Sequence, residues 1–354
     1  MVCRCRKDRI AARMMLARIQ TVVQAVQLKE VVVPTVLITG GHAGIGFECA
    51  KQLACRYGYN LVLAGRNMQR MEAAAQRLRM AYGVSVITLM LDTSSLSSVR
   101  DAATKFLAML DSGEVASFQV LLCNAGGYFD GPPTYTADGY ETTFATNCLG
   151  HFLLIELLTD RLGDNGRIVF TASGTHDPDT MDGKMVGIVA EPDAIALAYD
   201  GKDTKKLLSA GKRYATSKLC TILHAYELHR RLRRAGSTIA SIAYDPGAIP
   251  ETGLLRTMPK YLQWFTKTRI VKQIMRQVGV TQGSLGFSGA SLARIAAHPV
   301  FGGGSGMYFQ SHNGTLSDRR SSKMSYDEER ALKLWNDSKK LVRLQPSEES
   351  VLLK

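Results

Sequence analysis

The sequence lacks an uninterrupted apolar run of the about 18 residues that a membrane-spanning helix requires. Cysteine is sparse and scattered, without the paired spacing of a zinc site, so we expect no metal. The odd number of cysteines favours free thiols over a disulfide framework. They are Cys3, Cys5, Cys49, Cys55, Cys123, Cys148 and Cys220. We therefore expect the cytoplasm or another reducing compartment.

Acidic residues are outnumbered, with 31 Asp and Glu against 44 Lys and Arg and a net charge of +13. A basic protein binds nucleic acid, an anionic membrane or an anionic cofactor. The positive charge is divided among three stretches, residues 3–13, 229–236 and 256–276. Because no nucleic-acid-binding motif accompanies them, we expect no nucleic-acid partner.

Residues 1–30 form a separate basic amphipathic segment. Its apolar residues recur at helical spacing: Met15, Ile19, Val22, Val23 and Val26. Three alternatives stay open. The segment is a helix that packs on the domain or on a second subunit, a helix that contacts a membrane surface, or an organelle-targeting leader that is removed.

From residue 31 to 345, short apolar runs alternate with amphipathic helical patterns. The runs predict six strands, within residues 34–40, 60–65, 84–91, 118–127, 166–173 and 237–247. Such alternation is typical of an α/β fold, here a single Rossmann-type, doubly wound parallel sheet with helices on both faces. Residues 346–354 would be a C-terminal tail. The ligand crevice of such a sheet lies at the carboxyl ends of its strands.

The first predicted strand runs into a glycine-rich turn, TGGHAGIG. Gly40, Gly44 and Gly46 lie where the strand gives way to a helix. Glycine lets the backbone approach a pyrophosphate, which the free N–H groups of the helix then bind. The spacing differs from the general G-x-G-x-x-G pattern, but its position predicts a dinucleotide site that includes His42 and Ile45.

The end of the second predicted strand indicates which dinucleotide is bound. A carboxylate there binds the 2′-hydroxyl of NAD, whereas an arginine accommodates the 2′-phosphate of NADP. Gly65 stands at the acidic position and Arg66 follows it. Because a guanidinium forks well onto phosphate, the sequence favours NADP(H), with His42 assisting. The alternative is a surface arginine in a turn.

Tyr214 and Lys218 in YATSK would share one face of a helix, since they are four residues apart. Tyrosine has an ordinary pKa of about 10, and a nearby ammonium lowers that pKa. The pair therefore predicts a proton-transferring phenol with the cation that tunes it. A helix that carries the two residues by chance is the alternative.

Over residues 33–312 the chain resembles the short-chain dehydrogenase/reductases. The resemblance rests on the ordered motifs TGGHAGIG, LDTSS, NAGG, ATNCLGHF, RIVFTAS, YATSK and DPG. It implies a catalytic set in which Tyr214 moves the proton and Lys218 also holds the nicotinamide ribose. Ser173 aligns the reacting oxygen, and Asn147 holds a water of the proton relay. With the residues above, the expected cofactor contacts are Gly40, His42, Gly44, Ile45, Gly46, Arg66, Asp92, Thr93, Asn124, Ala125, Gly126, Tyr214, Lys218, Pro246 and Gly247.

Two stretches depart from the simplest members of this family. An insert of about residues 174–210 separates Ser173 from Tyr214, and its Asp, Gly and Lys content predicts a surface excursion at the mouth of the site. A lid of about residues 250–280 carries apolar residues that would line a pocket for an apolar substrate. Its basic residues would face water or anionic lipid. A core helix that simply covers the sheet is the alternative for the lid.

We expect an NADP(H)-dependent oxidoreductase that transfers hydride between nicotinamide and a lipophilic carbonyl or alcohol, assembled as a homodimer or homotetramer. The long insert is similar to that of the protochlorophyllide reductases, and the lid to that of retinol-dehydrogenase-like members. Reduction of a C=C bond in a tetrapyrrole therefore stays open. A non-catalytic NADP(H)-sensing protein is a third hypothesis. Peripheral membrane contact, through residues 1–30 or the lid, is an open alternative for the chain's location.

Overall fold

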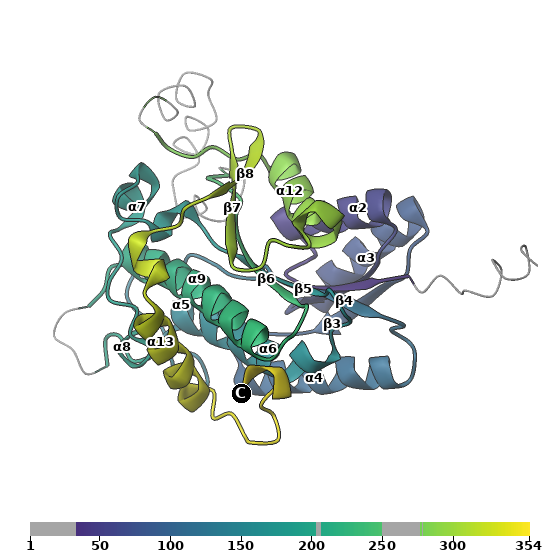
Figure 1. Ribbon diagram of the computed structural model, residues 1–354, viewed down its shortest axis with the longest axis horizontal. Helices are drawn as coiled ribbons and strands as arrows, with labels where there is room; N and C mark the ends of the chain where they lie inside the picture. Colours follow the sequence, from purple (N-terminus) through teal and green to yellow (C-terminus); the bar gives the residue numbers. More distant parts are fainter. Residues whose placement is uncertain (1–32, 203–206, 250–276, 278) are drawn as a thin grey trace, which may run out of the picture. The chain divides into compact units, whose positions relative to one another are not determined.

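The computed structural model describes residues 33–202, 207–249, 277 and 279–354 (Figure 1). The chain divides into two units, Met1–Val33 and Pro34–Lys354, and the fold described below is that of the second. The basic segment 1–30 and most of the predicted lid lie outside the described residues. Within the described part of the chain, every helix is too short or too polar to cross a membrane.

The second unit is built on an eight-stranded sheet in the order β3-β2-β1-β4-β5-β6-β7-β8. Its strands are β1 (Thr35–Thr39), β2 (Asn60–Gly65), β3 (Val86–Met90), β4 (Phe118–Cys123), β5 (Arg167–Thr171), β6 (Ala240–Asp245), β7 (Met307–His312) and β8 (Thr315–Arg319). Strands β1 to β7 are parallel, and the order reverses between β1 and β4. The doubly wound α/β fold is thus confirmed, and its crevice lies where β1 and β4 end.

The far edge of the sheet differs from the prediction. Strand β8 pairs antiparallel with β7, so the sheet is not wholly parallel. Asn313 and Gly314 join the two strands with φ angles of 50° and 82°. Two left-handed residues in a two-residue connection produce the tight hairpin that Asn-Gly favours.

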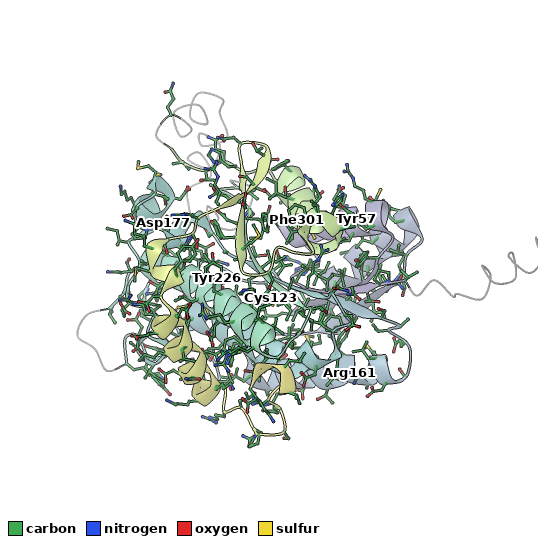
Figure 2. The ribbon with its side chains drawn as sticks, in the orientation of Figure 1. Tyr57, Cys123, Arg161, Asp177, Tyr226 and Phe301 are labelled. Carbon is green, nitrogen blue, oxygen red and sulfur yellow. The ribbon has the colours of Figure 1, made fainter. Side chains whose placement is uncertain are left out.

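Helices cover both faces of the sheet (Figure 1). One face carries α2 (Gly44–Tyr57), α3 (Met68–Tyr82) and α12 (Leu285–Ala297); the other carries α4 (Leu96–Asp111), α6 (Gly150–Leu158) and α9 (Ala210–Arg234). The sheet separates two apolar clusters, one under each helical layer. Cys123, labelled in Figure 2, ends strand β4 in the buried middle of the sheet.

A further helix, α13 (Glu328–Leu341), packs on the outer side of α9 (Figure 1). Its Trp335 is buried, and the indole lies edge-on to Phe152 of α6 with ring centroids 4.9 Å apart. Residues beyond it also lie on the body of the unit, since Leu353 is buried and its carbonyl oxygen accepts a hydrogen bond from Arg231 (2.7 Å).

The described part of the insert forms the 3-10 turn η3 (Gly174–His176), α7 (Met181–Val186) and α8 (Ala194–Ala198). Leu197 and Ala198 of α8 are buried in the same cluster as α6 and α9. The insert is therefore not a surface excursion alone, because α8 contributes to the core.

Candidate active site

The glycine-rich turn connects the end of β1 to helix α2 and is tightly packed. A Cβ added to Gly46 would lie 2.6 Å from the carbonyl oxygen of Gly40 and 2.7 Å from Nδ2 of Asn124, so any side chain is excluded there. Gly40 and Gly44 have φ angles of 69° and 56°. Helix α2 follows with no side-chain cap at Ala43 and no acidic residue in its first turn. Its first N–H groups therefore suit a pyrophosphate.

Basic groups gather at the end of β2. Arg66 follows the strand, and Arg70 lies one turn further on, in α3. His42 is close by, because a Cβ on Gly65 would lie 3.3 Å from its Nδ1. That Nδ1 is buried without a hydrogen-bond partner among the described residues. Burial lowers the pKa of His42, and the charges of Arg70 and Arg66 lower it further. Such a cluster suits a phosphate better than a hydroxyl.

The residues that follow β4 are hydrogen-bonded to Thr39 at the end of β1. Thr39 Oγ1 accepts hydrogen bonds from the backbone N–H groups of Asn124 and Ala125, both at 2.9 Å. The Asn124 side chain donates to the carbonyl oxygen of Thr39 (3.0 Å). The NAGG motif therefore lies directly beside the glycine-rich turn.

Asn147 lies in a short π-helical turn, Ala145–Leu149, a feature often found at functional sites. Its Oδ1 accepts a hydrogen bond from the N–H of Gly127 (2.9 Å), and its Nδ2 donates to Oγ of Ser217 (2.9 Å). A Cβ on Gly126 would lie 2.9 Å from Oδ1 of Asn147 and 3.7 Å from Nζ of Lys218. Asn147 and Lys218 thus face the same point.

Helix α9 brings Tyr214 and Lys218 to the end of β5. The Lys218 ammonium donates to the carbonyl oxygen of Thr171 (2.8 Å) and lies 5.7 Å from the centroid of the Tyr214 ring. The side chain of Ser173, the N-cap of η3, interacts with the Tyr214 hydroxyl and lowers its pKa. The structure therefore brings together the four residues that the sequence nominated for catalysis.

Burial dominates the protonation of this group. It raises the pKa of Tyr214 to about 12, while the interaction with Ser173 opposes the shift and the Asp245 charge adds to it. Burial also lowers the pKa of Lys218 to about 8. The net shift in the Tyr214 pKa is therefore upward, whereas the sequence led us to expect that the lysine lowers it. At neutral pH Tyr214 is a protonated phenol, which is a proton donor rather than a base.

The remaining predicted cofactor residues line the same edge of the sheet. Asp92 and Thr93 follow β3, where Oδ1 of Asp92 accepts from the hydroxyl of Ser94 (2.6 Å). Pro246 and Gly247 follow β6. The carbonyl oxygen of Pro246 accepts from Ser288 (2.7 Å), and the φ of Gly247 is 74°. Ile45 is half-buried in the first turn of α2.

Sequence reasoning missed three residues of this region. Arg70 had a signal, because it lies four positions after Arg66. Tyr128 directly follows the NAGG motif, and its ring stands edge-on to that of Tyr214 with centroids 5.7 Å apart. Asp245, within the DPG motif, is 1% exposed. Its position at the end of a predicted strand of the covered sheet was the available signal.

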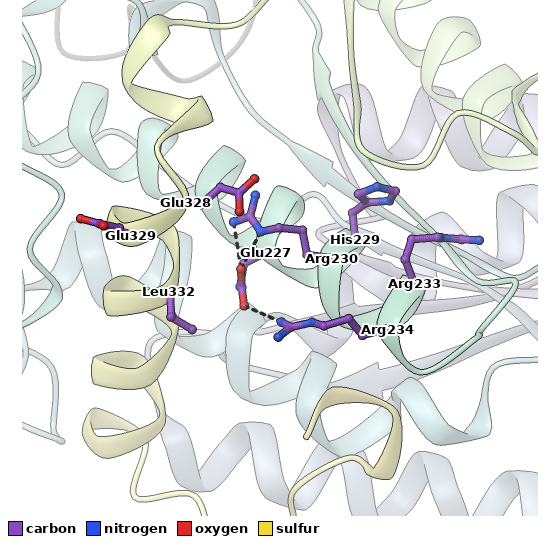
Figure 3. A pocket seen from close by; sticks show the side chains of 8 residues that line it. All are labelled: Glu227, His229, Arg230, Arg233, Arg234, Glu328, Glu329 and Leu332. Atoms are coloured by element: carbon purple, nitrogen blue, oxygen red, sulfur yellow. Dashed lines mark hydrogen bonds and ion pairs between the residues drawn. The ribbon is translucent and has the colours of Figure 1, made fainter.

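A hollow of about 520 Å³ lies elsewhere, between α9 and α13 (Figure 3). On its α9 side, Glu227 pairs with Arg230 (2.8 Å) and Arg234 (3.3 Å). Glu227 is 13 residues beyond Tyr214, or about 20 Å along the helix. This hollow is therefore not part of the candidate active site.

The fold is that of the doubly wound dinucleotide-binding proteins. Comparisons with known proteins identify the family within this fold. The sequence model of a family described as short chain dehydrogenase matches residues 34–180. Protochlorophyllide reductase, chloroplastic, of Chlamydomonas reinhardtii is 32% identical over 335 residues, covering 88% of this chain and 78% of that protein. The WW domain-containing oxidoreductase of Homo sapiens is 33% identical over 329 residues, covering 91% of this chain and 71% of that protein.

Among solved structures, an uncharacterized protein from Mycobacterium paratuberculosis is 27% identical with a TM-score of 0.63, covering 87% of this chain and 93% of that one. The chain belongs to the short-chain dehydrogenase family. The resemblance that its motifs indicated is confirmed.

Proposed function

We propose that this protein is an NADP(H)-dependent oxidoreductase that reduces a carbonyl group, or oxidises the matching alcohol, on an apolar small molecule. One observation carries the proposal. The Tyr214 phenol interacts with Ser173, lies 5.7 Å by its ring centroid from the Lys218 ammonium, and stands at the same edge of the sheet as the glycine-rich turn. NADP(H) is the cofactor because Arg66, Arg70 and His42 surround the position after β2 where a 2′-phosphate would lie.

When bound, the cofactor supplies the hydride. Tyr214 is protonated at neutral pH and donates its phenolic proton to the carbonyl oxygen of the substrate. The Ser173 hydroxyl, beside that phenol, aligns the same oxygen. Lys218, held by Thr171, stabilises the phenolate that the proton transfer leaves behind. Asn147 is fixed by Gly127 and Ser217 next to the lysine, where it would hold a water that returns the proton.

Reduction of a C=C bond in a tetrapyrrole is the second candidate. Similarity to a protochlorophyllide reductase supports it, as does the insert that follows Ser173. The WW domain-containing oxidoreductase is equally similar, so identity alone does not favour this candidate over the first.

The test is a panel of apolar aldehydes, ketones and alcohols in which NADPH absorbance is followed, with NADH as the cofactor control. A parallel arm contains protochlorophyllide, NADPH and light. We expect carbonyl-dependent NADPH consumption that exceeds NADH consumption by at least about tenfold. Turnover only in the illuminated arm would establish the second candidate. NADPH binding without turnover in either arm would establish the non-catalytic sensor.

Assembly and location stay predictions of this proposal. Light scattering of the full chain tests the homodimer or homotetramer. Flotation with anionic vesicles tests peripheral membrane contact through residues 1–30 or the lid. The word chloroplastic in the name of the Chlamydomonas relative supports an organelle-targeting role for residues 1–30, which import of a tagged full-length chain would test.

A further inference from the structure

Strand β6 ends in a buried carboxylate. Oδ2 of Asp245 accepts hydrogen bonds from the Tyr308 hydroxyl (3.0 Å) and the Gln310 amide (2.8 Å), and Oδ1 accepts from the N–H of Gly247 (2.9 Å). Three donors stabilise an ionised carboxylate away from water. All three are neutral groups, so the negative charge is not neutralised by the partners that fix its position.

The sheet places this charge beside the candidate active site. Strand register pairs Tyr244 with Thr171, so Asp245 stands next to the start of the segment that carries Ser173. A Cβ on Gly174 would lie 3.1 Å from Oδ2 of Asp245. The Lys218 ammonium is bonded to Thr171 at the same strand end.

The other titratable groups around Asp245 come from four elements. Asp182 of α7 faces the same point, because its Oδ2 would lie 3.0 Å from a Cβ on Gly174. Burial raises the pKa of Asp182, which favours its neutral form. His176 of η3 accepts a hydrogen bond from the N–H of Ser322 through Nε2, and burial lowers its pKa. Tyr308 of β7 is a neutral phenol, which leaves the Lys218 ammonium of α9 as the cation in this set.

A fixed anion acts on both groups of α9. It favours the charged form of Lys218 and the neutral form of Tyr214, so it raises both pKa values. For Lys218, burial favours the uncharged amine, and the interactions with Cys148 of the π-helical turn and with Asp245 oppose that shift in pKa. Tyr214 therefore stays protonated, and Lys218 stays charged, up to a higher pH than without Asp245.

We propose that Asp245 is a positioning residue whose carboxylate is the buried counter-charge of Lys218. This inference rests on the proposed function. It acts on the reaction through Lys218 and Tyr214 and does not touch the reacting atoms. The alkaline limit of carbonyl reduction is therefore set in part by a residue of β6.

The test compares Asp245→Asn with Asp182→Asn, which removes the neighbouring carboxyl group. Two readouts are taken against pH: kcat for carbonyl reduction at saturating NADPH, and the side-chain resonance of ¹⁵N-labelled Lys218 in the protein without ligand. In Asp245→Asn we expect the alkaline limb of kcat and the titration of Lys218 to move down by about one pH unit. In Asp182→Asn we expect both to stay within about 0.3 unit, since Asp182 is not among the groups that shift the pKa of Lys218.

Unchanged Lys218 titration in a folded Asp245→Asn protein would overturn the proposal. If that variant does not fold, Asp245→Ser is measured in its place, with the same two outcomes. The lysine titration needs no substrate. If the protein shows no carbonyl reductase activity, the proposed function is refuted. The titration of Lys218 still tests whether Asp245 is its counter-charge.

Discussion

Glu156 of α6 is a buried carboxyl group whose charge opposes folding. It is 2% exposed; its Oε2 accepts only a long hydrogen bond from the N–H of Ser350 (3.4 Å), and its Oε1 has no partner among the described residues. Burial raises its pKa from 4.5 to about 7, although the charges of Lys339 and Arg231 oppose the shift. We predict that Glu156→Gln stabilises the protein at alkaline pH.

The sign and size follow from linkage. Below about pH 4.5 the carboxyl is protonated in both the folded and the unfolded chain, so it costs nothing. Between about pH 4.5 and 7 the unfolded chain ionises first, and the free energy of unfolding falls as the pH rises. Above about pH 7 the full cost is present, and a shift of about 2.5 units corresponds to about 3 kcal/mol.

Urea unfolding of wild type and Glu156→Gln at pH 5 and pH 8 measures this effect. We expect the free energy of unfolding of the variant to be higher by about 2 to 3 kcal/mol at pH 8 and by less than about 1 kcal/mol at pH 5, with equal m values. The matched control is Glu72→Gln, an exposed carboxylate paired with Arg79, which should change stability by less than about 1 kcal/mol. A Glu156→Gln protein that is equally destabilised at both pH values would refute the reasoning.

Two further predictions concern cofactor binding, and NADPH fluorescence titration measures both. Gly46→Ala places a Cβ 2.6 Å from the Gly40 carbonyl oxygen and should weaken NADPH binding at least about 100-fold. The control Gly286→Ala, whose Cβ meets open space, should leave NADPH binding unchanged. Equal NADPH affinities of the two variants would contradict the glycine-rich turn as the binding site. Arg66→Ala and Arg70→Ala should each weaken NADPH binding about 10- to 100-fold and leave NADH binding nearly unchanged, so equal losses for both cofactors would contradict recognition of the 2′-phosphate.

The sequence predicted six of the eight strands because buried parallel strands are continuous apolar runs that few other elements produce. It failed at the β7–β8 edge. Strand β8 reads TLSDR, and an exposed edge strand has little apolar pattern to detect. The Asn313-Gly314 pair was the available signal, since that dipeptide favours a hairpin turn.

The candidate site was predicted where contiguous motifs place residues on one strand end or one helix face, as for Tyr214 and Lys218. Residues that reach the site through tertiary packing were missed, and Asp245 is the clearest case, because only the sheet register brings it beside Ser173. The sign of the Tyr214 pKa shift was also missed. Burial decides it, and the extent of burial depends on the whole fold.

The central claim is that the phenol of Tyr214 delivers the proton in a site that binds NADPH independently of it. The most direct measurement is kcat for reduction of a carbonyl substrate from the panel, at saturating NADPH, in Tyr214→Phe and in the control Tyr128→Phe. We predict that kcat falls about 100-fold or more in Tyr214→Phe while the Kd for NADPH stays within about threefold, and that Tyr128→Phe retains most of its activity. A Tyr214→Phe enzyme that turns over like the wild type would contradict the account.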